Sequence, residues 1–496
     1  MDIMRTKSIE QSIRDTEEPE FKLKKSLGAL DLLTFGIGVM IGTGIFVLTG
    51  VAAATSAGPA IAISFVVSGI ACALAALCYA EYASAVPVAG SAYTYTYATI
   101  GEFIAWIIGW DLILEFTVGG AAVSIGWSQY FISILENWFG ISLPAAVAGG
   151  EGAFMNLPAA FIALFLTAVL VVGITLSSRF NQVITSIKLL VILFFIIFGA
   201  FYVKTANWTP FIPSREPASG TASSLDATIW ELVFGGVGAF GFPGLVAGAA
   251  IVFFAYIGFD IVATTAEETR NPQRDMPIGI LGSLAIVTIL YVVVSLVMTG
   301  MVPYGELNTA APMATAFQAT GQAWATGLVS LGAILGLTSV IMILMLGQSR
   351  VGFAMSRDRL LPPWLGRVHP RFRTPYRLTL ITGSAVAILA AFTPIAAVAE
   401  LVNIGTLFAF VLVSIGVIIL RRTQPDLPRA FRTPLVPVLP IVAVLFLIYL
   451  MLNLAAWTWI RFFVWMALGV AIYFAYSRGH SRLGRTQAAE GSTEGS

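Results

Sequence analysis

The stretch Gly36-Ile-Gly-Val-Met-Ile-Gly-Thr-Gly-Ile-Phe46 lies in an apolar segment, residues 29–54, that is long enough to cross a bilayer. Four of these residues are glycine, and each costs about 1 kcal/mol relative to alanine inside a helix. A helix that serves only as a membrane anchor would not contain so many glycines. A helix that is broken at mid-membrane could contain them, because the backbone groups freed by the break can face a ligand. The N-terminal end of its second half suits a carboxylate. The alternative is a small-residue surface for packing against another helix.

A second interrupted stretch favours the broken helix. Phe253-Phe-Ala-Tyr-Ile-Gly-Phe-Asp260 also lies in an apolar span, and it places Gly258 and a charge at membrane depth. Two broken spans in matching positions of two halves are the sequence pattern of a binding site in a secondary transporter.

The composition excludes a soluble globular protein. The chain has 496 residues, of which 58% are hydrophobic and 11% are charged, and its mean hydropathy is +0.88. These values predict an all-α polytopic membrane protein. The net charge of +1 gives no reason to expect a nucleic-acid partner. Cys72 and Cys78 are expected to be apolar packing residues, so neither a disulfide nor a metal site is predicted.

Apolar runs predict about twelve transmembrane helices. We expect a helix at the membrane surface over 81–100 and a short lid-like helix over 226–240. The polar segments 1–27 and 478–496 should flank a membrane domain at 28–477, with a disordered tail. The predicted spans are 29–54, 59–80, 102–131, 158–176, 182–203, 246–267, 276–300, 327–349, 378–393, 396–420, 434–453 and 457–476.

The basic residues predict the orientation. With a cytoplasmic N-terminus, nearly all of the 27 Lys and Arg residues fall in predicted cytoplasmic segments. This asymmetry follows the positive-inside rule and predicts a multi-pass protein of the plasma (cell inner) membrane with both termini cytoplasmic. The sequence has no phosphate-binding loop and no Ser/His/Asp arrangement among the spans, which argues against an ATP-driven pump and against an enzyme.

Charged residues inside predicted spans are candidates for function because they are expensive at that depth. Lys188 lies six residues into the fifth span, so its ammonium must face a cavity or a carboxylate. Burial disfavours the charged form of an amine, which suits a proton carrier. Glu115 and Asp260 are the expected partners, with Asp111 one turn before Glu115. Alternatively, Lys188 snorkels to the interface.

Three further acidic residues are expected to have structural or gating roles. Glu400 opens the tenth span and is interpreted as a packing or interfacial charge. Glu267 and Glu268 lie near the cytoplasmic end of the sixth span. We expect them to pair with Arg270, Arg274 or the arginine-rich segment 350–377.

Three segments resemble a known family. Residues 38–46 resemble the first-helix signature of the amino acid–polyamine–organocation (APC) superfamily. Residues 253–277 are similar to the helix-six signature of the cationic amino acid transporter (CAT) branch and its bacterial relatives, and residues 347–362 resemble the segment that follows helix eight in that branch. The resemblance covers about residues 27–477. About twelve spans is fewer than in vertebrate members, which favours the bacterial subgroup, whose members include carriers of neutral amino acids.

The resemblance implies a LeuT-like fold and amino acid transport by alternating access. Two inverted five-helix repeats would occupy 28–203 and 246–421, followed by two extra helices at 434–476. The substrate carboxylate would meet the backbone N–H groups of Thr43 and Gly44, beside Gly42.

The resemblance also assigns the substrate ammonium, a gate and a coupling residue. Lys188 matches a helix-five lysine that takes the place of a sodium ion in proton-coupled relatives. Phe254 would close over the bound substrate. The ammonium would meet backbone carbonyls around Met40, Phe254, Ala255 and Ile257.

These observations predict a proton-coupled importer of L-amino acids that works as a monomer in a lipid bilayer, with protons as the coupling ion and no cofactor. Spans three, six, eight and ten should line the side-chain pocket, with Thr338, Ser339 and Met342 as candidates. Small neutral substrates are favoured. The alternative is an exchanger or uniporter for arginine, lysine or ornithine. An accessory subunit remains open, whereas Phe254 and the broken helices argue against a channel or a sensor.

Overall fold

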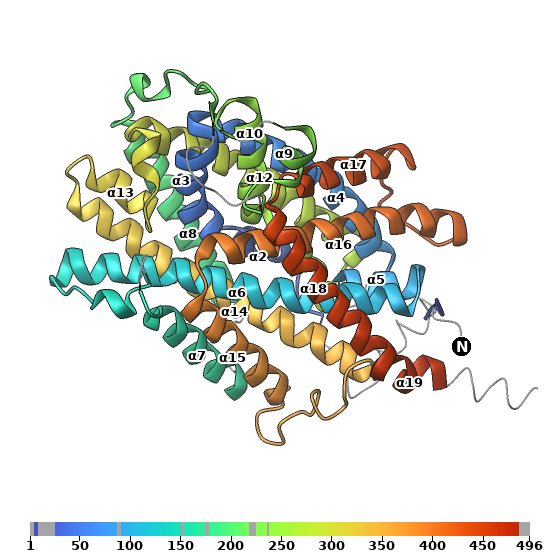
Figure 1. Cartoon of the computed structure of the whole chain (residues 1–496). Helices are drawn as coiled ribbons and strands as arrows, with labels where there is room; N and C mark the ends of the chain where they lie inside the picture. The colour runs from blue at the N-terminus through green and yellow to red at the C-terminus, as the bar shows by residue number, and fades with distance from the viewer. Residues whose placement is uncertain are drawn as a thin grey trace, which may run out of the picture.

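The computed structural model describes residues 4–7, 25–86, 91–149, 153–173, 178–217, 225–235 and 238–485. Within these ranges the protein is a bundle of long helices (Figure 1), so the predicted all-α polytopic fold is confirmed. Among the described residues, eight helical segments are long and apolar enough to cross a membrane, and four shorter apolar helices accompany them. One antiparallel pair of two-residue strands, β1 (Glu216–Pro217) and β2 (Gly238–Ala239), joins the connection after the fifth span.

Each predicted span corresponds to a single helix or to a run of shorter helical segments. The α-helices are α2 (Ala29–Met40), α3 (Thr49–Ala52), α4 (Ile61–Ala85), α5 (Ser91–Thr99), α6 (Glu102–Phe139), α7 (Leu157–Val172), α8 (Ser178–Ala200), α9 (Ile229–Phe234), α10 (Gly241–Val252), α11 (Phe259–Ala263), α12 (Pro272–Met301), α13 (Pro312–Gln318), α14 (Ala323–Arg357), α15 (Tyr376–Phe392), α16 (Ile395–Thr423), α17 (Val438–Leu452), α18 (Ala456–Ile472) and α19 (Arg478–His480).

The first predicted break is confirmed and lies directly after α2. Ile41 has an extended backbone (φ −71°, ψ 90°), and helical structure resumes with a π-helical turn, η1 (Gly44–Leu48). Gly44 is required by a close approach, because a Cβ atom there would lie 2.3 Å from the Cα of Ala255. The glycines therefore allow one broken span to touch the other.

The second predicted break is also confirmed. α10 runs into a 3₁₀ turn, η6 (Phe253–Tyr256), and then Ile257 is extended (φ −62°, ψ 128°) before α11 begins. Gly258 has φ +128°, a conformation that L side chains rarely adopt. Both unwound segments are buried, so their backbone groups must be satisfied by protein groups or by a ligand.

The connecting segments differ in detail from the prediction. Of the helix expected over 81–100, residues 81–85 continue α4 and Ser91–Thr99 form α5, whose Tyr93, Tyr95 and Tyr97 are buried where the helix packs against α6 and α16. Two of these tyrosines have buried carboxylate partners: the Tyr93 hydroxyl donates to Asp358 at 2.7 Å, and the Tyr97 hydroxyl donates to Glu102 at 2.9 Å. The predicted lid helix exists as α9, shortened to six residues and capped by Thr228 and Glu231. The helix α13 was not predicted.

α6 and α14 form the long central pair, and α16 and α15 also pack on α6 (Figure 1). α18 is fastened to α6 by two reciprocal bonds: the Trp110 indole donates to the Trp465 carbonyl at 2.9 Å, and the Trp465 indole donates to the Trp110 carbonyl at 3.1 Å.

The two ends of the described chain meet at the start of α6. Arg5 forms a two-pronged ion pair with Glu102, with N–O distances of 2.7 and 2.9 Å. Tyr97 and Tyr473 donate to the same carboxylate at 2.9 and 3.1 Å, and Ser481 donates to it as well. Most of the predicted segment 1–27 and residues 486–496 of the predicted tail lie outside the described residues.

Candidate functional site

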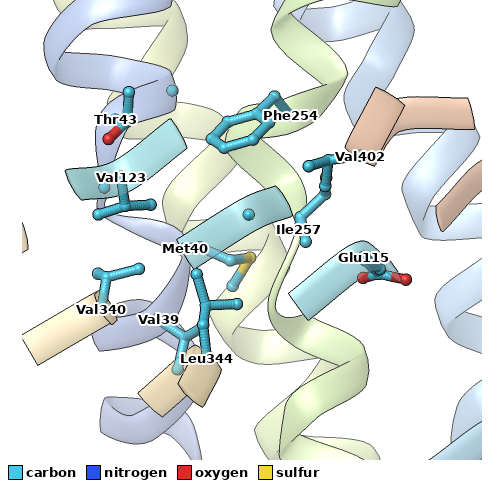
Figure 2. A pocket seen from close by; sticks show the side chains of 13 residues that line it. Val39, Met40, Thr43, Glu115, Val123, Phe254, Ile257, Val340, Leu344 and Val402 are labelled. Carbon is cyan, nitrogen blue, oxygen red and sulfur yellow. The ribbon is translucent and has the colours of Figure 1, made fainter. Parts of the chain in front are cut away.

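The two breaks enclose a small cavity at the centre of the bundle (Figure 2). Its free volume is about 20 Å³, which is room for about one water molecule. An amino acid can therefore enter only if the lining side chains move apart. The lining residues are Val39, Met40, Gly42, Thr43, Gly44, Glu115, Gly119, Val123, Phe254, Ile257, Val340, Leu344 and Val402.

Apart from Thr43 and Glu115, the side chains that line the cavity are apolar, and all four predicted spans contribute to them. Val123 belongs to α6, Ile257 to the second break, Val340 and Leu344 to α14, and Val402 to α16. The side-chain candidates from the eighth span were wrong. Thr338, Ser339 and Met342 are not among the lining residues, and the hydroxyl of Thr338 accepts a hydrogen bond from the Trp127 indole at 3.0 Å instead. α14 is rotated so that its valine and leucine face the cavity.

The predicted backbone positions gather at this cavity. Met40, Gly42, Thr43 and Gly44 line it from the first break, where the N–H groups of Ile45 and Phe46 in η1 donate to the Gly42 carbonyl at 3.2 Å. The hydroxyl of Thr43 is buried and has no hydrogen-bond partner among the described residues.

From the second break, Phe254 and Ile257 line the cavity, and the Phe254 ring lies between Thr43 and Val402 in Figure 2. Ala255 does not line the cavity. It lies behind Gly44, where the two breaks touch.

Tyr291 of α12 was missed by sequence reasoning. Its hydroxyl lies 2.6 Å from the carbonyl of Met40 and 2.9 Å from the carbonyl of Ala255, so it bridges the two breaks. Both carbonyls belong to the set predicted to meet the substrate ammonium. The available signal was a tyrosine in an otherwise apolar span, whose hydroxyl needs a buried partner.

Lys188 of α8 is completely buried, and its ammonium donates to the carbonyl of Gly38 at 2.5 Å, two residues before the end of α2. Gly336 makes space for the lysine stem, since a Cβ there would lie 3.1 Å from Cγ of Lys188. The expected pairing with Glu115 or Asp260 is wrong for this structure. Lys188 forms no carboxylate ion pair among the described residues, because a backbone carbonyl freed near the helix break takes that place.

The two predicted partner carboxylates differ in their hydrogen bonding. Glu115 reaches the cavity wall, and neither of its oxygens has a hydrogen-bond partner within the described ranges. Asp111, one turn earlier, is also buried, and neither of its carboxylate oxygens has a hydrogen-bond partner among the described residues. Asp260 accepts a bond from the Gly258 N–H at 3.1 Å, so it braces the second break.

Two of the remaining acidic residues, Glu268 and Glu400, have structural partners of the expected kind. Glu268 forms an ion pair with Arg350 at 2.9 Å, which confirms pairing with the arginine-rich segment that begins at residue 350. Glu400 accepts a hydrogen bond from Thr458 at 2.5 Å and ties α16 to α18.

Two broken helices around a closed cavity in an apolar helical bundle define a secondary transporter. The sequence matches the amino acid permease family over residues 27–477. The chain therefore belongs to that family, in the APC superfamily, and is a multi-pass membrane transporter rather than an enzyme.

The relatives of this chain are named for different substrates. The branched-chain amino acid permease BcaP of Bacillus subtilis is 49% identical over 488 residues, covering 97% of this chain and 99% of the relative. The methylthioribose transporter of the same organism is 47% identical, covering 93% of this chain and 95% of the relative. The vacuolar cationic amino acid transporter 4 of Arabidopsis thaliana is 38% identical, covering 86% of this chain and 68% of the relative.

Proposed function

We propose that this protein imports L-amino acids with apolar side chains by proton symport and alternating access. The observation that carries the proposal is the central cavity, where the backbone of two helix breaks meets a wall that consists mostly of valine and leucine. The proposal replaces the expectation of small substrates such as alanine. The wall suits a branched side chain, and the relative BcaP is named for branched-chain amino acids.

The substrate head group needs no ionised side chain in this proposal. Its carboxylate would accept from the N–H groups of Thr43 and Gly44 at the positive end of η1. Its ammonium would donate to the carbonyls of Met40 and of the second break around Phe254, Ala255 and Ile257. Only the side chain would then differ from one substrate to the next, and Val123, Val340 and Val402 would select it.

Lys188 is the proposed proton carrier. Its ammonium holds the carbonyl of Gly38, so loss of the proton removes a charge-assisted bond from the end of α2. Protonation would thereby shift the balance between outward-facing and inward-facing states. Glu115 and Asp260 would tune this step, and Phe254 would close the cavity from outside.

The proposal includes the setting of the protein. It would act as a monomer in the plasma membrane, with both termini cytoplasmic, protons as its only coupling ion and no cofactor. The concentration of Lys and Arg on one side of the predicted spans supports the orientation.

A second candidate function is exchange or uniport of arginine, lysine or ornithine. It is favoured by one observation, the Glu115 carboxylate on the cavity wall without a hydrogen-bond partner among the described residues. Relatives named cationic amino acid transporters add to this support.

Thermal unfolding of the purified protein against all twenty L-amino acids separates the two candidates, since a ligand that binds only the folded state stabilises it. Stabilisation by leucine, isoleucine and valine supports the proposal. Stabilisation by arginine or lysine alone supports the alternative. In proteoliposomes, an inward proton gradient should then drive leucine accumulation. Leucine exchange without accumulation would exclude symport.

A further inference from the structure

A second cavity of about 240 Å³ lies beside the start of α2. It is bounded by α2, the first turn of α8, α11 with the residues after it, and the second half of α14. No residue lines both cavities, but Leu344 of the central cavity and Ile343 of the second are neighbours on α14. Its free volume is enough for several water molecules, whereas the central cavity holds about one.

Asn181 of α8 is the informative residue of this cavity. Its side chain is 6% exposed, and its Oδ1 atom has no hydrogen-bond partner among the described residues. Buried amide oxygens are normally satisfied, so this position is missing a donor. Asp31 lines the same cavity, and its carboxylate is held in place by the Gln182 amide at 2.6 Å and the Gly28 N–H at 2.9 Å.

The second cavity is also lined by an ion pair whose two side chains are partly exposed. Arg350 and Glu268 both line the cavity and lie 2.9 Å apart, with side chains 36% and 26% exposed. Glu268 also accepts the N–H groups of Ser26 and Leu27 through its backbone carbonyl, so the segment before α2 closes against it. A guanidinium and a carboxylate on one wall, facing an unsatisfied acceptor, complement a zwitterion.

We propose that the second cavity is a transient binding site for the amino acid on the cytoplasmic side of the central cavity. The ammonium would donate to Asn181 Oδ1 and the Asp31 carboxylate, and the substrate carboxylate would take Arg350 from Glu268. This proposal rests on the proposed function, which supplies the substrate class and the orientation. The substrate affinity measured from the cytoplasmic side then depends on residues that entry from outside does not meet.

The test compares L-leucine uptake into right-side-out and everted membrane vesicles. Asn181→Ala should raise the KM about fivefold in everted vesicles and leave the KM in right-side-out vesicles within a factor of about two, as expected for one lost hydrogen bond. Asn181→Asp keeps an acceptor oxygen and should restore the everted KM. Ser186→Ala removes an exposed hydroxyl from the same helix and serves as the matched control.

Two results would overturn the second site. One is an equal KM shift in both vesicle orientations, and the other is no shift in either. If Asn181→Ala fails to fold, two other variants decide. A normal KM for Asn181→Asp together with a raised KM for Asp31→Asn, both measured in everted vesicles, supports the site. Normal KM values for both variants reject it. Absence of leucine transport by the wild type in both orientations would refute the proposed function and the second site with it.

Discussion

At the scale of single residues, Tyr291 is the clearest example of one hydroxyl serving two elements. It has one hydrogen and lies near two carbonyls, those of Met40 and Ala255. One of the two acceptors is therefore always incompletely satisfied, and it can receive a hydrogen bond from a substrate ammonium.

Tyr291→Phe should weaken leucine binding about two- to tenfold, because a hydrogen bond contributes about 0.5–1.5 kcal/mol. Tyr256→Phe is the matched control, since its hydroxyl donates to the Phe65 carbonyl at 2.7 Å, away from the cavity. Equilibrium binding and thermal unfolding of both variants check this. Both should lose stability, and equal losses of affinity would contradict a positioning role for Tyr291.

Lys188→Ala should abolish leucine accumulation driven by a proton gradient, because no titratable group would then hold the Gly38 carbonyl. Leucine-for-leucine exchange should persist at a reduced rate. Lys204→Ala removes a lysine from the connection after α8 and should leave accumulation unchanged. Proteoliposome uptake with and without the gradient decides the matter, and continued concentration of leucine by the Lys188 variant would refute the coupling role.

At the scale of elements, the contact between the two breaks depends on a missing side chain. Gly44→Ala would place a Cβ 2.3 Å from the Cα of Ala255 and push the broken spans apart. We expect a loss of about 1–3 kcal/mol in stability and no measurable transport. Gly42→Ala, two residues earlier, would meet Val340 at an ordinary 3.5 Å and should fold normally. Unfolding temperatures and uptake rates of the two variants test this prediction. Equal stability of both variants would argue against the contact between Gly44 and Ala255.

The sequence predicted both breaks because glycine weakens a continuous helix, and it interrupts an apolar span in each half of the chain. It did not predict which face of α14 points inward. Apolar residues occur on every face of that helix, so its polar Thr338 and Ser339 suggested a lining that Val340 and Leu344 provide instead. Nor did it predict the partner of Lys188, because a backbone carbonyl carries no sequence signal.

At the scale of the whole molecule, Glu102 unites parts of the chain that are far apart in sequence. Arg5, Tyr97, Tyr473 and Ser481 all donate to it, and its side chain is completely buried. No local pattern around residue 5 or 481 indicates this convergence, so sequence reasoning did not find it.

Arg5→Ala should lower stability by about 3–5 kcal/mol, because it leaves the Glu102 carboxylate buried without its cation. Arg350→Ala breaks an ion pair whose arginine is 36% exposed, and it should cost about 1 kcal/mol or less. Apparent unfolding temperatures in detergent compare the two. A smaller shift for Arg5→Ala than for Arg350→Ala would contradict the structural importance assigned to the cluster.

The same cluster has a consequence for biosynthesis. A chain leaves the ribosome with its N-terminus first, and domains usually begin to fold in that order. Residues 4–7, however, can reach their final positions only after Tyr473 and Ser481 have been made and the last helix has been inserted. Residues 4–7 are therefore synthesised long before Tyr473 and Ser481, and their docking belongs to the late steps of assembly.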